Sequence, residues 1–159
     1  MGTEVEHKFL VVDDSWRDAV ASATHIVQGY LARAGKATVR VRVKGERAFL
    51  TVKGPTRGVV RAEFEYEIPP GDAQQMLAEL ADGPVIDKVR HEVPVGAHVW
   101  EVDVFAGDNA PLVLAEVELA HADEPFEVPA WAGADVSDDP RYFNANLALS
   151  PYARRPATG

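Results

Sequence analysis

The chain has 159 residues, of which 47% are hydrophobic and 26% charged, and its formal net charge is −9. These values are typical of one soluble globular domain, which at this length can bury a core without disulfides or a structural metal. The absence of cysteine excludes zinc fingers, thiol catalysis, iron–sulfur clusters and disulfide scaffolds, and it fits a reducing compartment.

The N-terminal segment and the net charge narrow the expected partners. Acidic residues stand where a secretory signal carries basic ones, and no apolar run approaches the ~20 residues of a membrane span. We therefore expect a cytoplasmic protein with no membrane partner. The negative net charge argues against broad affinity for nucleic acid. The sequence leaves open whether the protein is a monomer or a homodimer.

Alternation of polar and apolar residues with period two dominates the chain and predicts about eight β-strands. In chain order they fall at about 4–12, 25–33, 37–44, 47–53, 58–68, 85–94, 98–105 and 112–120. Gly45-Glu46 and the loop over 53–58 are typical of hairpins, so antiparallel pairing is expected.

Short helices interrupt or follow these strands, and the first two are expected as outer elements. Asp14 and Ser15 favour a helix that ends near Ala23, and 70–72 leads into a helix over 73–80. Pro140 favours a last helix over 142–149. The organisation expected is one mainly β (α+β) domain over 1–150 and a tail over 151–159.

Six strands carry a face made almost entirely of charged residues, because side chains two apart share a face. The basic members include Lys8, Arg40, Arg42, Arg61, Lys88 and Arg90. The acidic members include Glu4, Glu6, Glu63, Glu65, Glu101, Asp103, Glu116 and Glu118. The opposite faces are apolar, as with Val39, Val41 and Val43.

Two interpretations fit this pattern. A half-solvated antiparallel sheet is its usual meaning. However, like charges recur two apart, as in Arg40 with Arg42 and Glu116 with Glu118, and a counter-charge would relieve their repulsion. If the sheet closes into an eight-stranded barrel with apolar faces outward, the charged faces line a tunnel that holds a small ligand. Carboxylates suit Mg²⁺ or Mn²⁺ and basic side chains suit phosphate, so the pattern indicates a metal–polyphosphate complex.

The motifs themselves resemble those of a known family. Residues 4–8, Glu-Val-Glu-His-Lys, fit the ExExK signature of the CYTH superfamily, also called triphosphate tunnel metalloenzymes. The later motifs follow the family order at 39–42, 50–53, 63–65, 88–90, 101–103 and 116–118. The resemblance spans residue 4 to about 149 and is strongest to short bacterial inorganic triphosphatases. It implies a closed eight-stranded antiparallel barrel whose lumen binds triphosphate with a divalent metal.

The resemblance also implies roles for individual residues. The phosphate-binding side chains would be those of Lys8, Arg40, Arg42, Lys53, Arg61, Lys88 and Arg90. Glu4, Glu6, Glu116 and Glu118 would hold one metal ion, and Glu63, Glu65 and Asp103 would position a second metal or a water. Lys8, Lys88 and Glu65 are expected to act in catalysis. The segment 141–144 resembles the closing helix of the family. Tyr30 either resembles a lumen tyrosine or packs in the barrel end.

The reaction expected is metal-dependent hydrolysis of inorganic triphosphate (tripolyphosphate) to pyrophosphate and phosphate, with a carboxylate orienting the attacking water. Two alternatives remain open. One is a hydrolase or cyclase acting on an organic triphosphate such as thiamine triphosphate or ATP, for which Trp16, Trp100 and Trp131 could stack at a tunnel mouth. The other is a non-catalytic polyphosphate-binding module, which would gain nothing from so many carboxylates.

Overall fold

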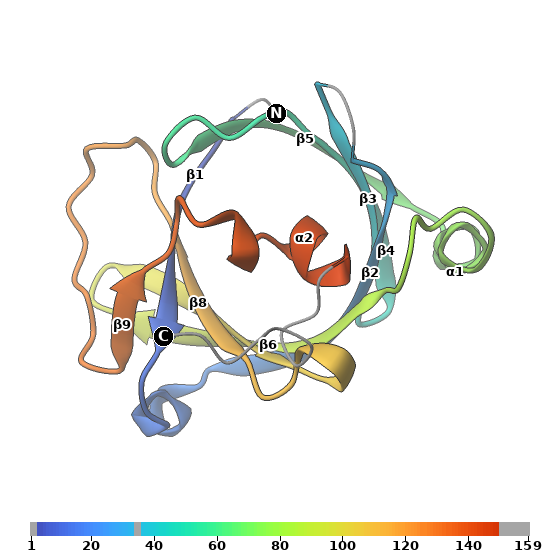
Figure 1. Cartoon of the computed structure of the whole chain (residues 1–159). Coiled ribbons are helices and arrows are strands. Elements are labelled where there is room, and N and C mark those ends of the chain that lie inside the picture. The colour runs from blue at the N-terminus through green and yellow to red at the C-terminus, as the bar shows by residue number, and fades with distance from the viewer. Residues whose placement is uncertain (1–2, 34–35, 150–159) are drawn as a thin grey trace.

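The computed structural model describes residues 3–33 and 36–149, and its main feature is a ring of antiparallel strands (Figure 1). The strands are β1 (Thr3–Val11), β2 (Ser22–Ala32), β3 (Thr38–Lys44), β4 (Arg47–Lys53), β5 (Val60–Ile68), β6 (Ile86–Val95), β7 (His98–Phe105), β8 (Val113–Glu118) and β9 (Ala132–Asp135). The helices are η1 (Ser15–Ala19), α1 (Pro70–Glu79), η2 (Gly107–Asn109), η3 (Pro140–Tyr142) and α2 (Asn144–Leu149).

Eight strands close into a barrel, which confirms the predicted fold class. They are hydrogen-bonded in the order β5-β4-β3-β2-β6-β7-β8-β1, and β1 returns to β5 to close the ring. Each neighbouring pair is antiparallel, with registers such as Arg42 opposite Phe49 and Glu101 opposite Glu116. The closure turns one face of every strand toward the interior, as the sequence pattern predicted.

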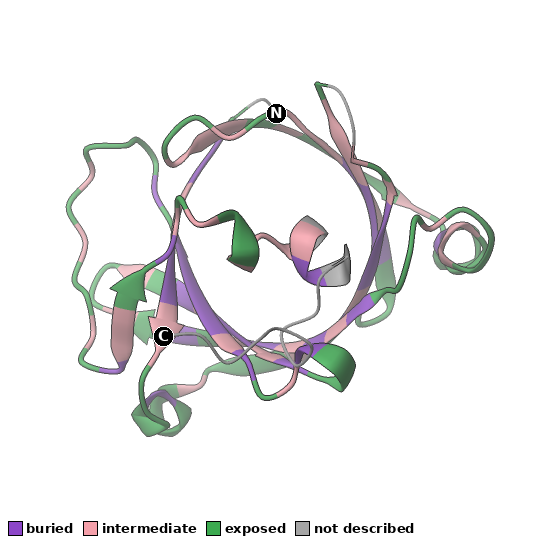
Figure 2. Ribbon diagram, in the orientation of Figure 1, coloured by how far each residue is buried: buried purple, intermediate pink, exposed green. Residues whose placement is uncertain are grey.

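Two apolar clusters cover the outer face of the ring, and a third packs inside it around Leu147 of α2. One cluster, which includes Trp16, Trp100 and Trp131, covers the outer face of β1 and β6–β8. A second cluster packs Ala73 of α1 against Val41 and Ala48 on the outer face of β3 and β4. Figure 2 shows the buried positions following the strands of the ring. Packing on the outer face therefore leaves the inner face available for charged side chains.

Close approach of α1 to the barrel depends on Gly29 of β2. A Cβ atom at this position would lie 2.8 Å from Cδ2 of Leu77, which is closer than carbon atoms normally pack. Glycine therefore allows the helix to lie directly on the strand.

One expectation about local structure is wrong, and one strand was not predicted. The helix expected over 14–23 is only the short 3-10 element η1, because residues 22–24 pair with β6 and begin β2 three positions early. Asp14 makes no capping hydrogen bond, and Asp13 accepts the one from the Ser15 amide instead. The strand β9, which pairs with the end of β1, was not predicted, because it is only four residues long.

The C-terminal helix α2 lies inside the ring of strands in Figure 1, whereas α1 and η1 lie outside it. Leu147 of α2 is fully buried and packs with Tyr30, Ile86 and Phe105 at one end of the lumen. This placement agrees with the closing helix that the resemblance implied. The expected tail at 151–159 lies outside the described residues. Among the helices of the described ranges, none is long and apolar enough to cross a membrane.

Candidate active site

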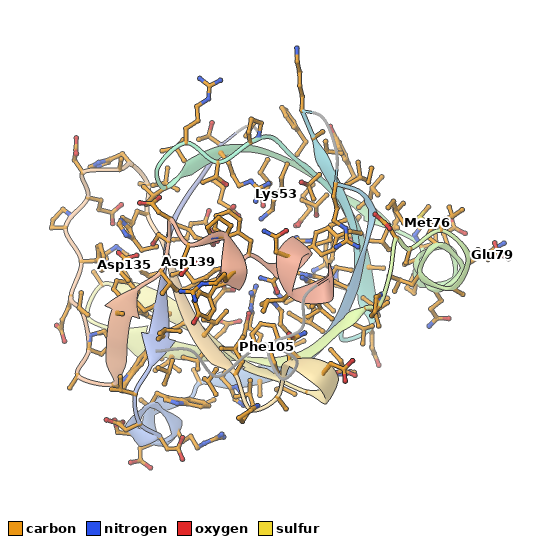
Figure 3. The ribbon with its side chains drawn as sticks, viewed as in Figure 1. Lys53, Met76, Glu79, Phe105, Asp135 and Asp139 are labelled. Atoms are coloured by element: carbon orange, nitrogen blue, oxygen red, sulfur yellow. The ribbon has the colours of Figure 1, made fainter. Side chains whose placement is uncertain are left out.

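The lumen contains a cavity of about 520 Å³ that is lined by the charged faces of the strands. All predicted site residues line this cavity except Lys88 and Asp103, which are buried in the wall beneath it. Figure 3 shows Lys53 extending into the interior of the ring, while Met76 and Glu79 of α1 lie outside it. The barrel therefore brings together residues from strands that are far apart in the sequence.

The deepest part of the site is an ion-pair cluster centred on Asp103 of β7. Nε and Nη2 of Arg90 each lie 2.8 Å from one of the two Asp103 carboxylate oxygens, and Nζ of Lys88 lies 2.8 Å from Oδ2. Burial alone would raise the pKa of the Asp103 carboxyl, but Arg90 and Lys88 hold it well below its usual value. Both oxygens of Asp103 are thus engaged by cations of the protein.

Cationic side chains of β3 form the centre of the cavity. Nη2 of Arg40 lies 3.3 Å from Oγ1 of Thr51 and 3.7 Å from Oε2 of Glu65, while its buried Nε has no hydrogen-bond partner among the described residues. Burial, together with Arg40 and Arg90, lowers the pKa of Arg42 to about 9. An anion in the cavity would relieve this repulsion.

Three carboxylates of the cavity lie beside lysines. Nζ of Lys53 lies 3.1 Å from both oxygens of Glu4 and 3.3 Å from Glu63. Nζ of Lys8 lies 3.7 Å from Oε1 of Glu116. Burial would raise the pKa of Glu116, but Lys8 and Arg90 lower it to about 2, so this residue is a firmly ionised carboxylate.

Other carboxylates crowd together without enough positive charge. Burial, followed by the neighbouring Glu116 and Glu4, raises the pKa of Glu6 well above its ordinary value. The pKa values of Glu63, Glu101 and Glu118 are also raised by burial first, with adjacent carboxylates adding to the shift. The acidic side of the cavity therefore attracts a cation.

Two predicted residues occupy the more open part of the lumen. The Glu65 side chain is 41% exposed, and its Oε2 accepts a hydrogen bond of 3.0 Å from Thr51 Oγ1. Nε of Arg61 donates to the Gly54 carbonyl at 3.0 Å, which ties this arginine to the β4–β5 loop. Both side chains line the cavity, although the exposed position of Glu65 leaves it in contact with solvent.

The segment that closes the lumen contacts both predicted catalytic lysines. Nζ of Lys8 donates to the Tyr142 carbonyl at 3.0 Å, and Nζ of Lys88 donates to Oδ1 of Asn144 at 3.1 Å. Tyr30 fits both of its expected descriptions, because it lines the cavity and its ring also packs beside Leu147.

Sequence reasoning left three lumen residues unassigned. Strand parity placed Glu101 on the charged face with Asp103, but no role was assigned to it. Gln28 lies on the inward parity of β2, but it is uncharged and did not stand out. Asn144 belongs to the segment that resembles the closing helix, but its contact with Lys88 could not be inferred from periodicity.

The acidic residues suit a divalent cation by their chemistry. Hard cations prefer carboxylate oxygens, and burial, with neighbouring carboxylates adding to it, raises the pKa values of Glu6, Glu101 and Glu118. Within residues 3–33 and 36–149, no three acidic or histidine side chains converge in an arrangement that would hold a metal. Lysines, such as Lys53 on Glu4, neutralise part of the set instead.

Lys88 should make the stability of the protein depend on pH. Burial lowers its pKa to about 7, although Asp103 offsets part of this effect. Between about pH 7 and 10 the unfolded chain therefore binds more protons at this residue than the folded chain, so the free energy of unfolding should rise with pH. Lys88→Met should show a shallower rise in urea unfolding experiments from pH 6.5 to 9. Parallel curves for the two proteins would contradict the buried lysine as the cause.

Comparisons with known proteins place this site in a family. The CYTH domain matches residues 2–146. The chain is 43% identical over 152 residues to the inorganic triphosphatase of Acetivibrio thermocellus, covering 96% of this chain and 97% of that protein. It is 38% identical over 155 residues to the inorganic triphosphatase of Nitrosomonas europaea, covering 93% and 98%. The crystal structure of the inorganic triphosphatase NE1496 superimposes with a TM-score of 0.68 at 33% identity, covering 94% and 96%. The chain therefore belongs to the CYTH domain family.

Proposed function

We propose that this protein hydrolyses inorganic triphosphate to pyrophosphate and phosphate with the help of Mg²⁺ or Mn²⁺. The observation that carries the proposal is a cavity of about 520 Å³ lined by both basic side chains and carboxylates, several of which have raised pKa values. A triphosphate–metal complex has the complementary charges. The names of the relatives that are 43% and 38% identical to the chain support the same substrate.

In this proposal the basic residues bind and orient the substrate. Arg40 and Arg42 present forked donors to phosphate oxygens, and Lys53, Arg61 and Arg90 add positive charge along the chain of phosphates. Lys8 lines the cavity beside Tyr142, where its ammonium group can stabilise charge on the leaving group, and Lys88, buried in the wall against Asn144, would add positive charge from beneath.

The carboxylates would hold the metal in two groups. Glu4, Glu6, Glu116 and Glu118 supply one set of oxygen donors, and Glu63 and Glu65 supply another. A divalent cation bound there would neutralise phosphate oxygens and favour departure of the leaving group. Asp103 differs from the others because Arg90 and Lys88 occupy both of its oxygens, so we assign it to orienting these two cations.

Glu65 is the proposed acceptor of the proton of the attacking water. It is the most solvent-accessible of the lumen carboxylates that contact a cation, and Thr51 holds one of its oxygens at 3.0 Å. The second oxygen is then available to orient a water molecule toward a phosphorus atom.

The alternatives receive less support. Trp16 and Trp100 are fully buried in the outer core, and Trp131 packs with them, so no tryptophan lines the lumen for stacking of a nucleobase or thiamine ring. A non-catalytic polyphosphate-binding module does not account for the raised pKa values of the acidic side. The proposed setting is the cytoplasm, with residues 1–150 as one domain.

Ligand binding should stabilise the fold strongly. Triphosphate and metal relieve repulsion that exists only in the folded lumen, and a ligand at a hundred times its Kd adds about 2.7 kcal/mol. For a chain of this size this corresponds to a rise in Tm of about 5–10 °C. Thermal unfolding with saturating tripolyphosphate and Mg²⁺ measures the effect, and an unchanged Tm would count against a ligand-binding lumen.

The direct test is phosphate release from tripolyphosphate, ATP, thiamine triphosphate and pyrophosphate in parallel, with Mg²⁺, with Mn²⁺ and with excess EDTA. We expect the highest kcat/KM with tripolyphosphate and no turnover in EDTA. A preference for ATP or thiamine triphosphate would select the alternative substrate class.

A further inference from the structure

Gln28 of β2 is a fully buried polar residue in the wall of the lumen. Its backbone lies opposite Arg42 of β3 on one side and Ile86 of β6 on the other. A side-chain amide buried at such a position must find partners for its oxygen and its N–H groups, or the fold loses stability. Its hydrogen bonds therefore show what the residue does.

The amide oxygen of Gln28 accepts a hydrogen bond of 2.7 Å from Nε of Arg42. The guanidinium has only donors, so the oxygen of the amide must face Arg42 and its nitrogen must face the other way. The nitrogen lies 3.4 Å from the Tyr30 hydroxyl, which accepts from it. The orientation of the amide is thus fixed at both ends.

The guanidinium group of Arg42 lies where neighbouring positive charges repel it, so a fixed hydrogen bond affects its position. It is almost fully buried beside Arg40 and Arg90, and the cavity is the open space next to it. Repulsion from two neighbouring guanidinium groups favours rotation away from them. Fixing Nε restricts this rotation and leaves the terminal N–H groups free for a ligand in the cavity.

We propose that Gln28 is a positioning residue for triphosphate, which holds Nε of Arg42 so that the other guanidinium N–H groups face a phosphate oxygen. The same amide donates to the Tyr30 oxygen, so the hydroxyl hydrogen of Tyr30 points away from Gln28. Gln28 thereby fixes the direction in which Arg42 and Tyr30 can donate hydrogen bonds, without touching the substrate. This inference rests on the proposed triphosphatase function.

The kinetic test uses Gln28→Leu, with Gln28→Met, which keeps the length of the side chain, as the second variant if the first does not fold. Loss of a hydrogen bond to a charged group costs about tenfold or more in affinity. We expect KM for tripolyphosphate to rise by about that factor while kcat changes much less, because the contact acts on binding. Gln75→Leu, on the exposed face of α1, is the matched control and should leave both constants unchanged.

A double-variant cycle separates positioning from a general structural effect. If Gln28 acts through Arg42, then Gln28→Leu should raise KM no further in a protein that already carries Arg42→Ala. Additive effects of the two substitutions, or an unchanged KM in Gln28→Leu, would overturn the proposal.

The Nε–Hε signal of Arg42 in nitrogen-15 NMR gives a readout that does not depend on activity. It is assigned by its absence in Arg42→Ala, and it should exchange slowly with water in the wild type and rapidly in Gln28→Leu. A wild type that releases no phosphate from tripolyphosphate would refute the proposed function. An exchange rate that is the same in both proteins would refute the role of Gln28 alone.

Discussion

Arg40→Ala should raise KM for tripolyphosphate by about 100-fold, because the substitution removes charge-assisted hydrogen bonds worth about 1.5–3 kcal/mol each. The buried Nε of Arg40 has no partner within the described residues, and its Nη2 makes only long contacts with Thr51 and Glu65. A phosphate oxygen in the cavity would accept hydrogen bonds from the terminal N–H groups of the Arg40 guanidinium. Steady-state phosphate release and titration calorimetry without metal measure the loss.

Arg47→Ala is the matched control for this experiment. Arg47 lies on the neighbouring strand β4, but it is 66% exposed and pairs with Glu67 through two hydrogen bonds of 2.7 and 3.1 Å. Its removal lowers the positive charge of the protein by the same amount without changing the cavity. If both variants weaken binding equally, the effect of Arg40 is a general charge effect and the proposed contact is wrong.

Glu116→Gln should lower metal-dependent hydrolysis by about 100-fold or more while metal-free binding of tripolyphosphate stays the same or becomes tighter. The substitution keeps the shape of a side chain that faces Lys8 at 3.7 Å and Arg90 at 4.0 Å, but it removes a firmly ionised ligand for a cation. A loss of this size corresponds to about 2.7 kcal/mol of transition-state stabilisation. The substitution of Glu116 also removes a negative charge that repels the substrate.

Glu79→Gln on the outer helix α1 serves as the control, since its only described hydrogen bond comes from Gln75. Calorimetric titration of Mn²⁺ into each protein gives a second readout, and only Glu116→Gln should bind the ion more weakly. Hydrolysis at the wild-type rate, or full activity of the wild type in EDTA, would contradict the metal site.

The inward direction of the charged side chains could be predicted because strand parity is a local property. Arg40, Arg42 and Glu116 alternate with apolar residues, and closure of the ring turned all three toward the lumen. Placement across the lumen could not be predicted. The pairing of Lys53 with Glu4, or of Asp103 with Arg90 and Lys88, depends on the tilt and stagger of the strands, which parity does not contain.

The other differences between the predicted and the observed structure have the same physical origin. Residues 22–24 join β2 because β6 offers free backbone partners, which outweigh the weak helix signal at Asp14. Asn144 reaches Lys88 because the chain after β9 turns into the ring, where Leu147 is buried. In each case a contact between distant parts of the chain decided a question that short-range patterns left open.

The placement of two apolar clusters on the outer face of the barrel also makes its wall unequal around the ring. β3 and β4 are held by seven register pairs and covered by α1, whereas within the described residues β5 joins β1 through the three pairs from Thr3–Ala62 to Val5–Val60. On the outer face of β5, Phe64 and Tyr66 remain 45% and 61% exposed. Among the described residues the ring therefore has its shortest strand pairing at β1–β5, although Val5 and Val60 of this junction pack on the outer core. Because Glu63 and Glu65 lie on β5, we expect local opening of the barrel to begin next to these two carboxylates.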